Sequence, residues 1–224
     1  MLRRILGPVP VIVLVLSVGW SGVLAVEPTN LTLRKQEMAT YVSSGEYARE
    51  VADVALAANK FLAKRIPQGA KPGKKLAIVF DIDETLLTNL NHIMANDYGY
   101  VPKIWGKWVI DGQALAIVPI QTVYDAAVRA KIDIFIITGR TESESFSTER
   151  NLRQIGYETW TRIIYRPDTT EQPLSNAGLK TDARRKLTQE GYTIIANIGD
   201  QNSDLANGYA ERTFKVPNPF YLVK

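Results

Sequence analysis

The sequence contains no cysteine and a single histidine, His92, among its 224 residues. Without cysteine the chain cannot form a disulfide scaffold, a zinc site with thiolate ligands or a cysteine nucleophile. One histidine leaves almost no room for a histidine-rich metal site or for a catalytic triad built around histidine. Any chemistry in this protein must therefore use carboxylates, hydroxyls and amines.

The sequence also lacks a large excess of charge of one sign. It has 27 lysine and arginine residues against 23 aspartate and glutamate residues, which gives a net charge of +4. Arg3 and Arg4 lie in the acid-free residues 1–25, and the remainder has 25 basic and 23 acidic residues, a net charge of +2. This near balance argues against nucleic acid as the main partner. The length and the 46% of hydrophobic residues predict one globular domain.

The first 25 residues have the pattern of a targeting segment. Two arginines precede an apolar run at residues 11–18, and small residues follow at 23–25. We therefore predict a secretory signal peptide at residues 1–25, a mature domain at 26–224, and export to the periplasm or the extracellular space. The alternative is an uncleaved membrane anchor, because residues 5–24 are about long enough to span a bilayer.

The rest of the chain alternates between strand and helix patterns, which predicts an α/β fold with a parallel sheet and helices on both faces. Residues 89–118 are irregular and rich in aromatic side chains. Ligands of such sheets bind beyond the carboxyl ends of the strands. The predicted strands are 76–80, 132–137, 162–165, 192–198 and 212–216, and the predicted helices are 31–66, 119–129, 145–155 and 181–189.

Polar residues stand where three of these strands end. They are Asp81 and Asp83 after the first strand, Thr138 and Gly139 after the second, and Asp200 and Asp204 after the fourth. Lys180 stands at the start of the predicted helix before the fourth strand. Carboxylates that converge repel one another unless a hard cation joins them, and oxygen ligands suit Mg²⁺. Lys180 and the backbone N–H groups after Thr138 are suited to bind an anion beside this cation. The pattern therefore predicts a site for a divalent cation and a phosphate group.

These residues resemble the motifs of the haloacid-dehalogenase-like (HAD) phosphohydrolases. The DIDET sequence at residues 81–85 is similar to motif I, Thr138 to motif II, Lys180 to motif III, and Asp200 with Asp204 to motif IV. The secreted acid phosphatases, which include bacterial class C enzymes and plant vegetative storage proteins, are the closer resemblance. It covers residues 35–224 and rests on the segments FDIDETLLTN, ITGR, NLRQIGYETW, GDQNSDL and RTFKVPNPFY.

The resemblance implies a HAD-type Rossmannoid sheet with a small cap, and a role for each motif residue. Asp81 would be the nucleophile that becomes an aspartyl phosphate, and Asp83 the acid and base that serves the leaving group and the water. The remaining roles follow the same motifs. Thr138, Gly139 and Lys180 would bind the phosphate, and Mg²⁺ would be held by Asp81, the Asp83 carbonyl, Asp200 and Asp204, the last directly or through water.

The implied function is a secreted, Mg²⁺-dependent acid phosphatase for small phosphate monoesters, with nucleoside monophosphates as one candidate class. The alternatives are a non-enzymatic storage or binding protein on the same fold, and a phosphotransferase that passes the phosphoryl group to an alcohol. A receiver domain of a response regulator also gathers acids, a threonine and a lysine at strand ends, but it fits less well. This chain is expected to be exported, and its acid pair is spaced as D-x-D at the end of one strand. The class C relatives are commonly lipoproteins, but this chain has no cysteine to acylate. The sequence predicts no particular oligomeric state.

Several other residues have two interpretations. Trp108 and Tyr221 either form a stacking platform for a nucleobase or aryl group, or simply pack a loop onto the domain. Arg140 either forms a salt bridge or binds substrate, and Glu84 is expected to be a structural or solvated acid rather than a catalytic one. His92 is expected to be a surface or cap residue. The cap itself is expected to come from residues 31–66 and 89–118.

Overall fold

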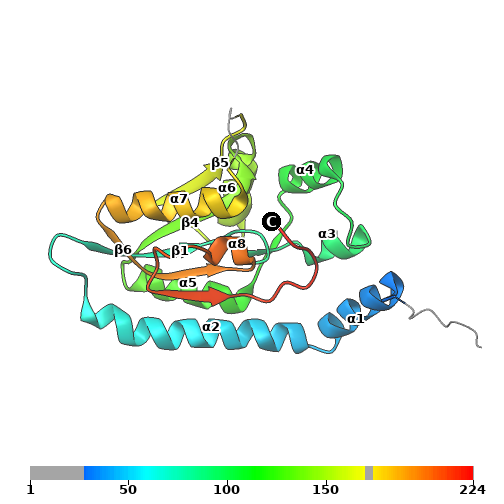
Figure 1. Cartoon of the computed structure of the whole chain (residues 1–224), viewed down its shortest axis with the longest axis horizontal. Helices are drawn as coiled ribbons and strands as arrows, with labels where there is room; N and C mark the ends of the chain where they lie inside the picture. Colours follow the sequence, from blue (N-terminus) through cyan, green and yellow to red (C-terminus); the bar gives the residue numbers. More distant parts are fainter. Residues whose placement is uncertain (1–27, 170–173, 224) are drawn as a thin grey trace, which may run out of the picture.

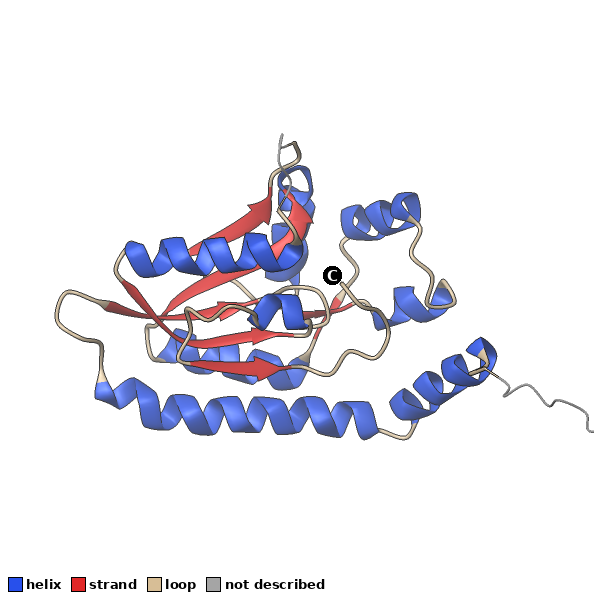
Figure 2. Ribbon diagram, viewed as in Figure 1, coloured by secondary structure: helices blue, strands red, loops and turns tan. Residues whose placement is uncertain are grey.

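The computed structural model describes residues 28–169 and 174–223, so the predicted signal peptide or anchor lies outside the described residues. Its centre is a five-stranded sheet in the order β5-β4-β1-β6-β7, in which every neighbouring pair is parallel (Figures 1 and 2). The predicted parallel α/β sheet is therefore confirmed. Its strands are β1 (Lys75–Phe80), β4 (Asp133–Thr141), β5 (Arg162–Arg166), β6 (Tyr192–Gly199) and β7 (Arg212–Lys215).

Helices cover both faces of this sheet. Helices α2 (Glu46–Arg65) and α5 (Val118–Arg129) lie on one face, and α7 (Asn176–Gln189) lies on the other (Figure 1). Side chains of β1 alternate between the two cores, as expected for a strand buried on both faces: Ile78 and Phe80 pack toward α2 and α5, and Ala77 and Val79 toward α7. Helix α6 (Ser145–Gln154) follows β4 after the short turn η2 (Glu142–Glu144).

The segment 31–66 differs from its expected place in a cap. It forms two helices, α1 (Leu31–Ser43) and α2, separated at Gly45, whose φ of 78° favours glycine, and it ends in the turn η1 (Ile66–Gln68). Helix α2 covers the face of the sheet, because its apolar stripe of Val51, Ala55, Ala58 and Leu62 is buried in the core there. Helix α1 extends past the sheet and has no buried residue (Figure 1).

Residues 89–118 lie beyond the carboxyl ends of the strands, where a cap was expected (Figure 1). They contain helices α3 (Leu90–Ala95) and α4 (Pro102–Asp111), and their base is the antiparallel pair β2 (Leu87–Thr88) and β3 (Leu115–Ala116). Within the described residues, no helix is both long and apolar enough to cross a membrane.

Candidate active site

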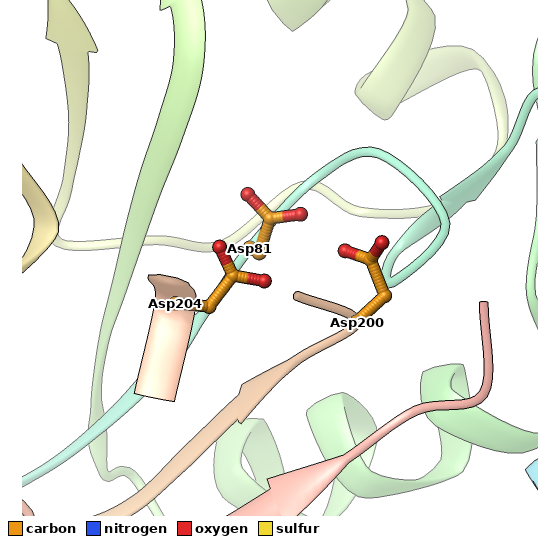
Figure 3. A group of neighbouring side chains, drawn as sticks. All are labelled: Asp81, Asp200 and Asp204. Carbon is orange, nitrogen blue, oxygen red and sulfur yellow. The ribbon is translucent and has the colours of Figure 1, made fainter. Parts of the chain in front are cut away.

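Three acidic side chains converge at the carboxyl ends of two adjacent strands. Asp81 follows β1, Asp200 follows β6, and Asp204 lies in the short helix α8 (Asn202–Leu205). All three side chains are buried and point toward one another, and one carboxylate oxygen of each lies within 4.8 Å of the others (Figure 3). The sequence placed these residues near one another, and the structure brings them together.

Lys180 joins two of these carboxylates. Its Nζ donates hydrogen bonds to Asp81 Oδ1 and to Asp204 Oδ1, the latter at 2.5 Å. Burial alone would favour the neutral amine, but Asp81 and Asp204 outweigh it and raise the pKa of Lys180 above its usual value. Lys180 therefore stays an ammonium. It lies in the second turn of α7 rather than at its start as expected, because α7 begins at Asn176, where the hydroxyl of the N-cap Ser175 accepts a hydrogen bond from the N–H of Gly178.

The acidic cluster carries an electrostatic cost that a cation would relieve. Burial and the nearby Asp204 charge raise the pKa of Asp200 to about 7. Burial also raises the pKa of Asp81 well above its usual range; Lys180 opposes this shift, and Asp204 and Asp200 add to it. A compact set of buried carboxylate oxygens that repel one another suits a hard divalent cation. The residues present therefore fit a divalent cation, and Asp81, Asp200 and Asp204 are the side chains that could hold it.

The surrounding residues orient the cluster. Asn218 Nδ2 and Gln201 Nε2 donate to Asp200 Oδ2 at 2.7 and 2.6 Å. The N–H of Gln201 donates to Asp204 Oδ2 at 2.8 Å. Gly199 leaves room for Asp204, because a Cβ at position 199 would lie 2.5 Å from the Cβ of Asp204. Gly199 is thus required by close approach rather than by its backbone angles.

Arg184, which the sequence motifs do not include, anchors the loop that carries Asp204. This arginine is fully buried, and its guanidinium donates to the backbone carbonyls of Asp204, Ala206 and Gly208. The available signal was its spacing, since residues four apart lie on the same face of a helix and Arg184 follows Lys180 by four. A buried arginine that binds three carbonyls holds the loop without neutralising any carboxylate.

Asp83 has a different set of partners from the cluster. Its carboxylate accepts hydrogen bonds from Arg140 Nη2 at 2.7 Å and Arg140 Nε at 3.1 Å, and from Asn89 Nδ2 at 2.9 Å. The salt-bridge interpretation of Arg140 is therefore confirmed. Asp83 still lines the same cavity as Asp81, Lys180 and Asp200.

Glu84 is a buried acid, so of the two expected roles, structural or solvated, the structural one applies. It accepts hydrogen bonds from the N–H of Asn89 at 2.5 Å and from the Tyr221 hydroxyl at 2.7 Å. Its backbone adopts a φ of 53° in the turn after β1, and its side chain is fully buried. Burial and the Asp83 charge raise the pKa of Glu84 to about 7.

Thr138 and Gly139 lie in the last part of β4, next to β1. Thr138 is buried, and its hydroxyl accepts a hydrogen bond from the N–H of Arg140 at 3.1 Å. Gly139 is exposed and lines the cavity beside Arg140. Thr138 is not one of the lining residues, so of the two only Gly139 reaches the cavity.

A cavity of about 920 Å³ lies over the acidic cluster, between the strand ends and residues 92–106 of the cap. Aromatic side chains form part of its wall, and they are Tyr98, Tyr100, Trp105, Phe220 and Tyr221. Trp108 is not one of the lining residues. It stacks on His92 with ring centroids 5.1 Å apart and donates to Asn89 Oδ1 at 2.8 Å. The packing interpretation thus applies to Trp108, and Trp105 is the tryptophan that faces the cavity.

His92 lies in the cap helix α3, as expected. It is half-buried between Trp105 and Trp108, and it also lines the cavity. Burial lowers its pKa below the usual value, which favours the neutral ring.

Comparisons with known proteins agree with this geometry. The chain is 36% identical over 155 residues to the stem 28 kDa glycoprotein of Glycine max, covering 67% of this chain and 61% of the relative. It is 33% identical over 149 residues to acid phosphatase 1 of Solanum lycopersicum, covering 65% and 58%. The chain thus spans about three fifths of the length of these relatives.

The fold matches a solved structure over most of its length. The class C acid phosphatase from Bacillus anthracis superposes with a TM-score of 0.69 and 23% sequence identity, covering 85% of this chain and 86% of that one. The family model of the HAD superfamily, subfamily IIIB (acid phosphatase), matches residues 16–224. With the sheet, the cap and the acidic cluster in place, this match shows that the chain belongs to HAD subfamily IIIB, the acid phosphatases.

Proposed function

We propose that this protein is a metal-dependent acid phosphatase that hydrolyses small phosphate monoesters. The observation that carries the proposal is the buried cluster of Asp81, Asp200 and Asp204 joined by Lys180 at the floor of a cavity. Phosphoryl transfer is catalysed mainly by positioning and by stabilisation of charge, and this cluster supplies both. Membership of the acid phosphatase family supports the same conclusion.

Asp81 is the proposed nucleophile. Its carboxylate oxygen attacks phosphorus, the bond between phosphorus and the ester oxygen breaks, and Asp83 gives a proton to the departing oxygen. Water then attacks the aspartyl phosphate and loses a proton to Asp83, and the bond between Asp81 and phosphorus breaks to release phosphate. Lys180, which bonds Asp81, offsets the negative charge that gathers when a phosphate approaches.

Asp81, Asp200 and Asp204 are the proposed side-chain ligands of Mg²⁺, with the Asp83 backbone carbonyl as a further ligand. When bound, this ion would neutralise charge on the phosphate oxygens and on the carboxylates. Gly139 and the backbone that follows Thr138 are proposed to hold the other phosphate oxygens, next to Lys180.

The aromatic wall of the cavity supports a substrate class with a flat group, such as aryl phosphates and nucleoside monophosphates. Trp105 and Tyr221, from the cap and the C-terminal segment, are the proposed contacts for that group. We further propose that the protein is exported, since the N-terminal pattern is that of a signal peptide. We infer no nucleic-acid partner.

The test is hydrolysis of 4-nitrophenyl phosphate by purified residues 26–224 at about pH 5.5, with Mg²⁺ or with EDTA. Asp81→Asn should abolish turnover, and Asp53→Asn, a change at an exposed acid on α2, should leave it intact. Residual activity of Asp81→Asn above about a hundredth of wild type would refute the nucleophile assignment. A folded wild type without turnover in any metal would favour a storage or binding protein, and transfer to an added alcohol would indicate a phosphotransferase.

A further inference from the structure

We propose that Arg140 is a positioning residue, which holds the Asp83 carboxylate where it can exchange a proton with the ester oxygen. The inference rests on the proposed function, in which Asp83 is the acid and base. Proton transfer needs the acid within hydrogen-bond reach of the leaving oxygen, so a carboxylate free to rotate would lose much of its effect.

The Asp83 side chain retains 19% of its exposure, whereas the side chain of Arg140 retains 2%. A partly exposed carboxylate at the edge of a cavity has several orientations and water as a competing partner. The guanidinium restricts it, because Nε and Nη2 of Arg140 bond the two carboxylate oxygens of Asp83 in a fork. The buried guanidinium thus restrains the more exposed carboxylate.

Arg140 is itself held in place by other elements. Its Nη1 donates to the hydroxyl of Thr148 on α6 at 3.1 Å, and its guanidinium carbon lies 5.9 Å from the ring centroid of Trp105 on α4. The arginine therefore has a fixed position that does not depend on Asp83 alone, as a positioning group requires.

Asn89 is a second residue that supports the same carboxylate. Its Nδ2 donates to Asp83 Oδ1 at 2.9 Å, while its Oδ1 accepts from Trp108 Nε1 at 2.8 Å. Trp108 thus fixes the amide orientation from the cap, and Asp83 is held between a strand residue and a residue at the base of the cap.

The rival role for Arg140 is direct binding of the substrate phosphate, since it also lines the cavity. The two roles differ in how they respond to the leaving group. A poor leaving group such as an alkoxide needs protonation as its bond breaks, whereas 4-nitrophenolate leaves with little help. Loss of a contact with the phosphate group would weaken the binding of both substrates by a similar factor, and it would also weaken the binding of inorganic phosphate.

The experiment compares wild type with Arg140→Met on ethyl phosphate and 4-nitrophenyl phosphate. We expect kcat/KM for ethyl phosphate to fall about 30-fold and kcat/KM for the aryl ester to fall less than about threefold. This ratio covers only the steps up to departure of the leaving group, whereas hydrolysis of the aspartyl phosphate is the same step for both esters. The inhibition constant of inorganic phosphate should stay within about twofold of wild type, and Arg140→Lys should restore part of the lost rate because it keeps the charge without the fork. Equal losses of kcat/KM on both esters, or a large rise in the phosphate inhibition constant, would overturn the proposal.

Thr148→Val provides a milder test if Arg140→Met fails to fold, since it removes only the support of Nη1. It should show the same dependence on leaving group at a smaller size, and equal losses on both esters would again overturn the positioning role. A wild type that hydrolyses neither ester overturns the proposed function and this inference together. Activity that depends on Asp81 but shows no leaving-group effect in the variants overturns the inference alone.

Discussion

Lys180 in α7 and Asp204 in α8 form a buried ion pair, with Nζ 2.5 Å from Oδ1. The same amine bonds Asp81, so one positive charge lies between two carboxylates that come from different parts of the chain. Removing one partner of a buried pair leaves uncompensated charge, which costs more than the pair itself contributes. The lysine is thus both a structural and a functional element of the cluster.

Replacing Lys180 by methionine should therefore impair both activity and folding. We expect kcat to fall at least about 100-fold, because a preorganised charge at the phosphate is lost. The free energy of unfolding should fall by about 3 kcal/mol in EDTA, measured by urea denaturation. Lys186→Met, a change at an exposed lysine of the same helix, is the control. A kcat within about threefold of wild type would contradict the role of Lys180.

A divalent ion should stabilise the folded protein through the acidic cluster. Mg²⁺ at about 100 times its dissociation constant should add about 2.7 kcal/mol to the free energy of unfolding, seen as a rise in Tm. Asp200→Asn should lose most of that rise, whereas Asp53→Asn should keep it. In EDTA the Asp200→Asn protein should be no less stable than wild type at neutral pH, because burial and Asp204 already disfavour the Asp200 charge. If Mg²⁺ leaves the Tm of wild type unchanged, the metal site is refuted.

Glu84 should make stability depend on pH. Its pKa is raised from 4.5 to about 7 in the folded state by burial, so the folded protein binds this proton more tightly than the unfolded chain does. Its contribution is fully present below about pH 4.5 and is lost as the pH rises toward about 7, a change of about 3 kcal/mol. Glu84→Gln keeps the shape and removes the titration.

The measurement is urea unfolding of wild type and Glu84→Gln between about pH 4.5 and pH 8 in EDTA. As the pH rises, wild type should lose stability relative to Glu84→Gln, because only wild type has the Glu84 carboxyl to ionise. The titration of Asp200 occurs in both proteins and cancels in the difference. Parallel curves over this range would mean that Glu84 is ionised in the folded protein throughout.

The two cap tryptophans should behave differently toward substrates. Trp105→Ala should raise KM for nucleoside monophosphates more than for ethyl phosphate, because only the former offers a flat group to the cavity wall. Trp108→Ala should change KM for both classes by a similar factor, since Trp108 packs on His92 and orients Asn89. Steady-state kinetics with both substrates checks this. A selective nucleotide effect at Trp108 alone would contradict the assignment.

The sequence by itself determined the sheet and the acidic residues at its edge. Short apolar runs in β1, β4 and β6 are recognisable without contacts, and the carboxyl ends of parallel strands share one edge of a sheet. Asp81, Thr138 and Asp200 could therefore be placed near one another from their positions after these runs.

The tertiary structure alone decided which side chains face one another. The apolar stripe of α2 shows that one side of this helix is buried. It does not show whether the helix packs on a face of the sheet or forms part of the cap, because either position would bury the same residues. The partners of Arg140, Trp108 and Arg184 are far away in sequence, and spacing along the chain holds no information on which long side chain meets which atom. Those contacts arise only when the strands, α6, α7 and the cap pack together, and they assign Trp105 rather than Trp108 to the cavity.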